Sequence, residues 1–214
     1  MRLRGRVQIV GLLAALGRKW GSRRGINMNF SVEALEAGSD VLLVRPTKFV
    51  DRRGYFMETW SKAAFAEIGI PTDFVQDNES LSAMRGTVRG LHYQRAPAEQ
   101  AKLVRVLRGA IFDVVVDIRP ASRTFGKWLG VTLSSDEGNH LYVPGGYAHG
   151  FVTLTNETVV TYKVDAPYSR ECEGGIRWND PELGIRWPST GNEVILSERD
   201  AILPLFRENV VDHE

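Results

Sequence analysis

Residues 103–118, with the sequence LVRVLRGAIFDVVVDI, contain the pattern that decides the fold. Two apolar runs rich in β-branched residues, 103–106 and 110–118, are separated by Arg108 and Gly109. Val and Ile fit the pleated surface of a sheet, and a glycine between two such runs allows the chain to turn. This stretch is therefore predicted to form two strands joined by a turn.

The same pattern recurs on both sides of this stretch. Further strands are predicted for residues 41–44, 54–60, 128–133, 149–154 and 158–164. One helix is expected after Ser61, a suitable N-cap, and is expected to end at Gly69 and Pro71. Because few helices separate the strands, a βαβ arrangement is disfavoured. The pattern predicts an all-β sandwich or jelly-roll barrel with a few short helices.

Composition and charge exclude several classes of protein. The chain has 214 residues, of which 43% are hydrophobic and 25% charged, enough for one well-buried domain. Seven basic and no acidic residues occur in 1–27, which leaves 20 basic against 26 acidic residues in the remainder. This acidic remainder is a poor surface for nucleic acid. The apolar run at 9–16 is interrupted by Gly11 and is far shorter than the roughly 20 residues of a membrane span.

These features lead to a prediction about domains and location. Residues 28–214 are expected to be one domain, and 1–27 a dispensable basic extension that precedes the true start at Met28. Neither a membrane nor a nucleic acid is expected as a partner. The single cysteine, Cys172, cannot form an internal disulfide, and nothing else indicates an oxidising compartment. The expected location is the cytoplasm.

Two histidines in glycine- and aromatic-rich segments suggest a metal site at first. His149 ends the pattern Pro144-x-Gly146-x-x-His149, which resembles the second motif of metal-binding cupins. Those proteins carry two histidines separated by one residue in the first motif. Here His92 stands at the first of these positions, and Gln94 takes the place of the second histidine. Glutamine is a poor metal ligand, and two histidines do not complete a three-ligand site. No metal is therefore expected.

Acid–base chemistry fits the same residues better. His92 is a suitable general base because an unperturbed histidine titrates near pH 6.5, at about the pH of the cell. A lysine such as Lys102 could stabilise an enolate oxygen, and a tyrosine such as Tyr162 could return a proton. Taken alone, Lys102 is as well explained as a solvated strand residue and Tyr162 as a core aromatic.

The sequence resembles a known family, the cupin-fold dTDP-4-dehydrorhamnose 3,5-epimerases. The resemblance extends from about Val41 to Leu205 and consists of motifs in a fixed order. They are Asp51-x-Arg53-Gly54-x-Phe56-x-Glu58, Phe74-Val75-Gln76-Asp77-Asn78, Arg89-Gly90-Leu91-His92, Lys102-Leu103-Val104-Arg105, Phe112-Asp113-Val114, Asp117-Ile118-Arg119, Ala148-His149-Gly150-Phe151, Trp178-Asn179-Asp180-Pro181 and Leu196-Ser197-x-x-Asp200.

The resemblance implies a cupin-type double-stranded β-helix and an epimerase that needs no metal or cofactor. Its substrate is expected to be a dTDP-4-keto-6-deoxyhexose inverted at positions 3 and 5, on the route to dTDP-L-rhamnose. By resemblance, His92 is the base and Asp200 its carboxylate partner, Lys102 stabilises the enolate and Tyr162 delivers a proton to the opposite face. Implied substrate contacts are Arg53, Glu58, Gln76, Asn78, Arg89, His149, Glu173, Arg199 and, stacking on thymine, Tyr168. Family members are homodimers in which an N-terminal segment crosses to the partner.

Two alternatives remain. A relative of the same fold inverts only one centre of a related dTDP-4-keto-6-deoxysugar, and such relatives differ chiefly at the proton donor. A protein of another class would bind the nucleotide sugar without catalysis. The presence of His92, Asp200, Lys102 and Tyr162 favours the enzyme.

Overall fold

The computed structural model describes residues 29–191 and 193–210, and within these ranges the chain forms thirteen strands and three short helices. The strands are β1 (Phe30–Ala34), β2 (Leu42–Pro46), β3 (Phe49–Asp51), β4 (Gly54–Phe56), β5 (Gln76–Ser82), β6 (Val88–Gln94), β7 (Lys102–Arg108), β8 (Ala110–Asp117), β9 (Trp128–Ser134), β10 (His140–Val143), β11 (Tyr147–Thr153), β12 (Thr158–Val164) and β13 (Glu173–Gly175). The helices are α1 (Lys62–Glu67), α2 (Glu198–Ala201) and α3 (Phe206–Val210).

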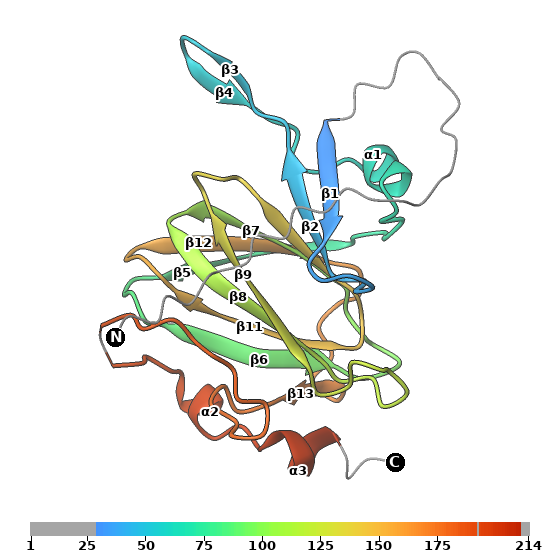
Figure 1. The fold of residues 1–214 in the computed structure, drawn as a ribbon, viewed down its shortest axis with the longest axis vertical. Coiled ribbons are helices and arrows are strands. Elements are labelled where there is room, and N and C mark those ends of the chain that lie inside the picture. The colour runs from blue at the N-terminus through green and yellow to red at the C-terminus, as the bar shows by residue number, and fades with distance from the viewer. Residues whose placement is uncertain (1–28, 192, 211–214) are drawn as a thin grey trace, which may run out of the picture.

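Two antiparallel sheets face each other and enclose the main core (Figure 1). One has six strands in the order β1-β2-β10-β7-β12-β5, and the other has five in the order β13-β6-β11-β8-β9. Side chains such as Val104, Ile111, Val115, Leu133 and Leu141 fill the space between them and are at most 1% exposed. Apolar residues alternate with outward-facing ones along the strands, so the two inner faces form one apolar layer. The predicted jelly-roll architecture is confirmed.

The outer faces of both sheets are also covered. Helix α1 packs Phe65 against Phe30, with ring centroids 4.9 Å apart, outside the six-stranded sheet. The C-terminal segment places Ile176 and Phe206 in a second apolar cluster on the five-stranded sheet. As predicted, Ser61 caps α1, and its hydroxyl accepts a hydrogen bond from the Ala64 N–H at 3.5 Å.

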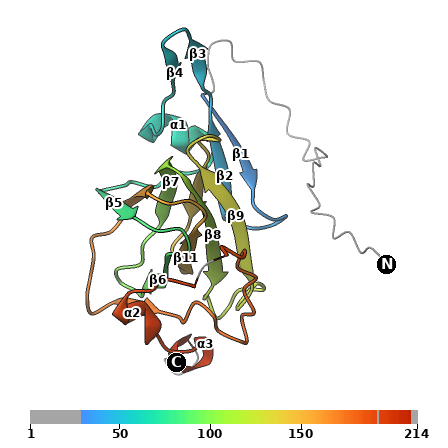
Figure 2. The same cartoon turned by 90° about the vertical axis from the view of Figure 1, so that its left-hand side faces the viewer.

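Several strand predictions coincide with the structure, and one is too long. The predicted strand 158–164 is β12, and 110–118 is β8 without its last residue. The strand predicted for 54–60 ends at Phe56, where the short β3–β4 hairpin ends. That hairpin projects from the rest of the molecule at the end far from β6, β13 and α2, as both views show (Figure 2). The prediction for residues 1–27 falls outside the described residues.

In the described part of the chain, no helix combines the length and apolar character that a bilayer crossing requires.

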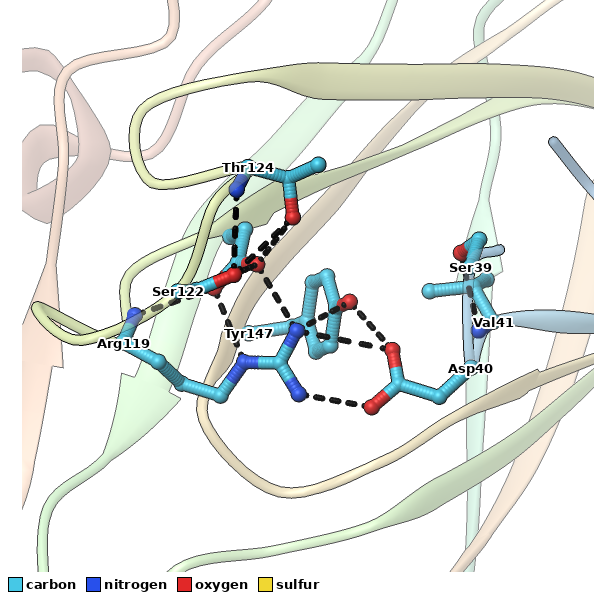
Figure 3. Close-up of polar contacts among 8 residues, drawn as sticks. Ser39, Asp40, Val41, Arg119, Ser122, Thr124 and Tyr147 are labelled. Carbon is cyan, nitrogen blue, oxygen red and sulfur yellow. Dashed lines mark hydrogen bonds and ion pairs between the residues drawn. The ribbon is translucent and has the colours of Figure 1, made fainter. Parts of the chain in front are cut away.

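A polar cluster joins the loop after β8 to Asp40, two positions before β2, and to the start of β11 (Figure 3). The Arg119 guanidinium donates to Asp40 Oδ2 and to the Tyr147 hydroxyl, each at 2.6 Å. The Tyr147 hydroxyl donates in turn to Asp40. Burial raises the pKa of Tyr147, and its hydrogen bond to Asp40 raises the pKa further, so the hydroxyl stays protonated as a donor. The cluster thus links three segments of the chain at the end of β8.

Asp117 is the buried centre of this cluster, and we expect Asp117→Ala to lower the free energy of unfolding by about 3 kcal/mol. Its side chain is 2% exposed and accepts hydrogen bonds from Arg119 at 2.7 Å and from the hydroxyls of Ser122 and Thr124 at 2.6 Å. Removing the carboxylate leaves these donors without their acceptor. Urea unfolding followed by tryptophan fluorescence measures the change. Glu33→Ala, which breaks an exposed ion pair with Arg45, is the control and should leave the midpoint unchanged. Equal midpoints for wild type and Asp117→Ala would contradict the prediction.

Candidate active site

A pocket of about 470 Å³ lies between the two sheets. Its walls come from β6 and β11 on one side and from β5, β7 and β12 on the other, and residues 195–200 close its rim. Nine of the thirteen site residues predicted from the sequence line it. They are His92, Asp200, Tyr162, Lys102, Arg89, His149, Tyr168, Glu173 and Arg199.

A bulge in β6 brings Arg89 and His92 to the same side of the strand. The two are three positions apart, a spacing that places side chains on opposite faces of a regular strand. The pairing with β11 shifts between them, because His92 pairs with His149 whereas Arg89 pairs with Phe151. Gly90 lies within this bulge with φ of 115°, a conformation that favours glycine. A Cβ at Gly90 would lie 2.7 Å from the backbone of β11.

His92 and Asp200 form a hydrogen-bonded pair, with 2.7 Å between His92 Nε2 and Asp200 Oδ1. The imidazole is 39% exposed to the pocket, whereas the carboxylate is 6% exposed. Burial raises the pKa of Asp200, but hydrogen bonds from His92, the Gly90 N–H and the Ser197 side chain outweigh it and lower the pKa. Asp200 therefore remains ionised and is placed to stabilise a protonated His92.

The short helix α2 holds Asp200 in this position. Ser197 caps the helix, and its hydroxyl oxygen accepts a hydrogen bond from the Asp200 N–H at 3.0 Å. Just before the cap, Ile195 forms an isolated bridge beside β6, with backbone hydrogen bonds to Gly86 at 3.0 Å and Val88 at 2.9 Å. The segment that carries the carboxylate is thus fastened to the strand that carries the base.

A second histidine–carboxylate pair lies deeper and was only half anticipated. His149 Nε2 is 2.8 Å from Asp113 Oδ1, and the two side chains are 10% and 0% exposed. Burial raises the pKa of Asp113, although His149 and Lys102 favour its ionised form. Sequence analysis predicted His149 but assigned no role to Asp113. The available signal was a carboxylate in the apolar run 110–118, because a buried Asp requires a partner.

Lys102 and Tyr162 project from the sheet opposite His92. Lys102 on β7 is 7% exposed and Tyr162 on β12 is half-buried. Burial lowers the pKa of Lys102 to about 8, with Asp165 and Asp113 limiting the decrease. Burial also raises the pKa of Tyr162, against the opposing effect of Arg89. The hydroxyl is therefore protonated at neutral pH and has a proton to donate. A ligand in the pocket therefore has His92 on one face and Tyr162 on the other.

Three residues at the rim bind one another. The Tyr168 hydroxyl donates to Glu173 Oε2 at 2.6 Å, and Arg199 forms an ion pair with the same oxygen. Burial raises the pKa of Glu173, but Arg199 and Tyr168 outweigh it and lower the pKa. The Tyr168 residue is 56% exposed, so its ring is open to a ligand.

Four predicted residues do not line this pocket. Gln76 and Asn78 lie on β5, where Asn78 pairs with Tyr162 of β12. Gln76 Nε2 donates a hydrogen bond to Asn78 Oδ1 at 2.8 Å. Because side chains alternate along a strand, both residues share a face of β5 with Ser80, which lines the pocket. Arg53 lies in the turn of the β3–β4 hairpin, at the other end of the molecule, bound to Asp51 (Figure 1). Glu58 follows this hairpin and accepts a hydrogen bond from Asn29 at 2.8 Å.

The place of a second metal-binding histidine is occupied by Gln94. Its Oε1 accepts a hydrogen bond from the Ser169 N–H at 2.7 Å, so the oxygen is already engaged with the protein. Over residues 29–191 and 193–210, no group of three or more His, Cys, Asp or Glu side chains is arranged to hold a metal ion.

The sequence of this chain has a match among known protein families. Residues 37–208 match the family described as dTDP-4-dehydrorhamnose 3,5-epimerase. The chain belongs to this family. This match and the similar solved structures confirm the family, the cupin-type fold and the enzyme class that were predicted from the sequence.

Individual relatives of the epimerase family agree with this assignment. A dTDP-4-dehydrorhamnose 3,5-epimerase of Sinorhizobium fredii is 52% identical over 174 residues, which cover 79% of this chain and 87% of the relative. The Bacillus anthracis epimerase, solved with TDP and PPi bound, gives a TM-score of 0.78 at 47% identity and covers 82% of this chain and 100% of its own. The Legionella pneumophila dTDP-6-deoxy-D-glucose-3,5-epimerase, in complex with dTDP-4-keto-L-rhamnose, gives 0.78 at 41% identity, covering 82% and 92%.

Proposed function

We propose that this chain epimerises positions 3 and 5 of dTDP-4-dehydro-6-deoxy-D-glucose to give dTDP-4-dehydro-L-rhamnose. The 4-keto group acidifies the protons on both neighbouring carbons, so each inversion needs only removal and return of one proton. His92 takes the proton, the electron pair moves onto the keto oxygen as an enolate, and a proton returns to the carbon from the opposite face. Neither an oxidant nor a cofactor takes part in this exchange.

One observation carries the proposal: His92 and Tyr162 come from facing sheets, so a sugar between them has a base on one face and a proton donor on the other. Inversion requires these two faces to differ. Asp200 stabilises the imidazolium that forms, and Lys102 supplies the positive charge for the enolate oxygen. Arg89 and His149 border the same space and are assigned to the sugar.

The nucleotide is assigned to the rim. Tyr168 offers an exposed aromatic face for thymine, and Arg199 offers a guanidinium whose fork suits phosphate oxygens. Glu173 joins the two residues. Gln76 and Asn78 on β5 complete the proposed contacts within the chain.

We propose in addition that the protein works as a homodimer in which part of the site comes from the partner. The β3–β4 hairpin exposes four apolar side chains, Phe49, Val50, Tyr55 and Phe56, by 44 to 77%. An exposed apolar hairpin is typical of an interface. Docking of this hairpin onto a second copy would bring Arg53, and Glu58 behind it, to the partner's pocket. Sedimentation should give twice the mass of one chain, and a single-chain mass would contradict the dimer.

The cytoplasm is the proposed location, because the one cysteine of the chain, Cys172, is a free thiol.

Proton exchange tests the function directly. Purified protein is incubated with dTDP-4-keto-6-deoxyglucose in deuterated water while NMR follows the hydrogens at C3 and C5. Deuterium should enter both positions, and dTDP-L-rhamnose should form when a 4-keto reductase and its reduced nicotinamide are added. Label at one position would establish a single-centre epimerase instead, and label at neither position would favour a nucleotide-sugar-binding protein without catalysis.

Tyr162→Phe is expected to abolish double inversion while proton removal by His92 continues. The hydroxyl is the proposed proton donor on the face opposite His92, and phenylalanine preserves the ring without the proton. Deuterium should still enter through His92, but the yield of the L-rhamno product, measured by coupling to the reductase, should fall about 100-fold. Tyr142→Phe is the control, because Tyr142 bonds Thr72 outside the pocket at 2.8 Å. Unchanged double inversion in Tyr162→Phe would remove Tyr162 from this role.

A further inference from the structure

Gln94 lines the pocket, and both its amide nitrogen and its amide oxygen are hydrogen-bonded to the protein. The residue is 6% exposed and lies on β6, two positions after His92. Its Nε2 donates to Ala98 O at 2.6 Å and to Pro167 O at 3.2 Å. Its Oε1 accepts from the Ser169 N–H at 2.7 Å. Because an amide has two N–H donors and one carbonyl oxygen, each of these atoms is engaged with the protein.

Two of these three bonds are made immediately on either side of Tyr168. Gln94 therefore fixes the backbone before and after an aromatic residue that is itself 56% exposed at the rim. The far end of the same ring is also held, since the Tyr168 hydroxyl donates to Glu173 Oε2 at 2.6 Å. Glu173 is the residue that pairs with Gln94 across β6 and β13. One side chain and its strand partner thus hold both ends of the exposed ring.

We propose that Gln94 is a positioning residue for nucleotide binding, which presents the Tyr168 ring as a preformed surface for the base. The inference rests on the proposed function, in which Tyr168 stacks on the nucleobase. An exposed tyrosine on a loose loop would lose conformational freedom each time a base stacks on it. Holding the loop in the unliganded protein removes that cost and raises affinity without any contact to the ligand.

Neighbouring bonds extend the attachment of this loop. Gln100 Nε2 donates to Ala166 O at 2.7 Å, and Asp165 Oδ1 accepts from the Ala101 N–H at 2.7 Å. These bonds hold the loop one or more residues before Pro167. Gln94 differs because it binds the two residues adjacent to Tyr168, so its loss should affect the ring most.

The test measures dTDP binding by calorimetry in Gln94→Met, which keeps the length of the side chain and removes its hydrogen bonds. The dissociation constant should rise about tenfold, within the range that stacking of one base on an aromatic ring contributes. The turnover of C3 and C5 exchange at saturating substrate should stay within about threefold of wild type, because Gln94 does not touch the reacting atoms.

Asn139→Leu is the matched control. Asn139 is also a buried amide, 4% exposed, whose Oδ1 accepts from the Ser134 N–H at 3.1 Å and whose Nδ2 donates to Thr132 O at 3.0 Å. It lies outside the pocket lining. This variant should lose thermal stability as Gln94→Met does, with dTDP affinity unchanged. An equal loss of affinity in both variants would overturn the proposal, because it would reflect general destabilisation.

A double-mutant cycle separates positioning from structure. In a Tyr168→Ala background, Gln94→Met should cause no further loss of dTDP affinity, since the ring that it positions is gone. Additive losses would overturn the proposal.

Gln100→Met removes a single bond to the same loop and provides a milder variant. Its expected loss of dTDP affinity is about twofold to threefold and should also disappear without Tyr168. Failure of the proposed function is distinguishable, because wild type itself would then not exchange the C3 and C5 protons, whereas the effect of Gln94→Met on dTDP affinity is measured separately by calorimetry.

Discussion

A His92→Asn variant is expected to exchange neither the C3 nor the C5 proton of the sugar, with turnover at least about 1,000-fold below that of wild type. Asparagine keeps an amide close to the main chain, at the level of the imidazole Nδ1, but it cannot accept a proton at neutral pH. Both inversions depend on the same base, because His92 is the pocket histidine that is 39% exposed and paired with an ionised carboxylate. NMR in deuterated water measures both exchanges in one experiment.

The control for His92→Asn is dTDP binding, which should change by less than about threefold since the base acts on the sugar and not on the nucleotide.

Asp200→Asn should also lower turnover, by about 100-fold or more, because the imidazolium loses its charged partner. Glu182→Gln, which alters an exposed ion pair with Arg207 outside the pocket, should leave turnover unchanged. Exchange at one ring position in His92→Asn would mean that a different base serves that position.

Lys102→Met is expected to lower turnover about 100- to 1,000-fold and to weaken dTDP binding much less. Lys102 is 7% exposed in the pocket wall, where a charge has a strong effect on an enolate oxygen that forms only along the reaction path. Separate measurements of turnover and of the dTDP dissociation constant check this. A large loss of nucleotide affinity with normal turnover would instead assign Lys102 to binding.

The same lysine predicts a pH dependence. Burial lowers the pKa of Lys102 to about 8, so its positive charge is present below that pH and is lost as the pH rises through it. Turnover should therefore decline on the alkaline side with a midpoint near pH 8. In Lys102→Arg the guanidinium stays charged throughout this range, so the alkaline decline should move to higher pH. An identical alkaline limb in wild type and Lys102→Arg would assign the decline to another group.

Much of the fold follows from local sequence patterns. β12 and β8 were predicted almost to the residue, because their β-branched runs are bounded by turn residues and are buried between two sheets. β5 was not predicted as a strand, since its sequence QDNESLS is polar and lies at the edge of its sheet. Its strand conformation comes from pairing with β12, a long-range contact that local preference does not encode.

The sequence by itself determined the family, the sandwich of short strands and nine residues that line one pocket. The tertiary structure alone decided how they meet. His92 and Asp200 are 108 positions apart and become partners only through the bulge at Gly90 and the bridge at Ile195. Asp113 gained its role from His149 across β8 and β11, and Gln94 from the loop around Tyr168. The physical reason is that residue types and spacing specify local conformation, whereas charge stabilisation and proton transfer depend on distances that arise only when remote strands pack together.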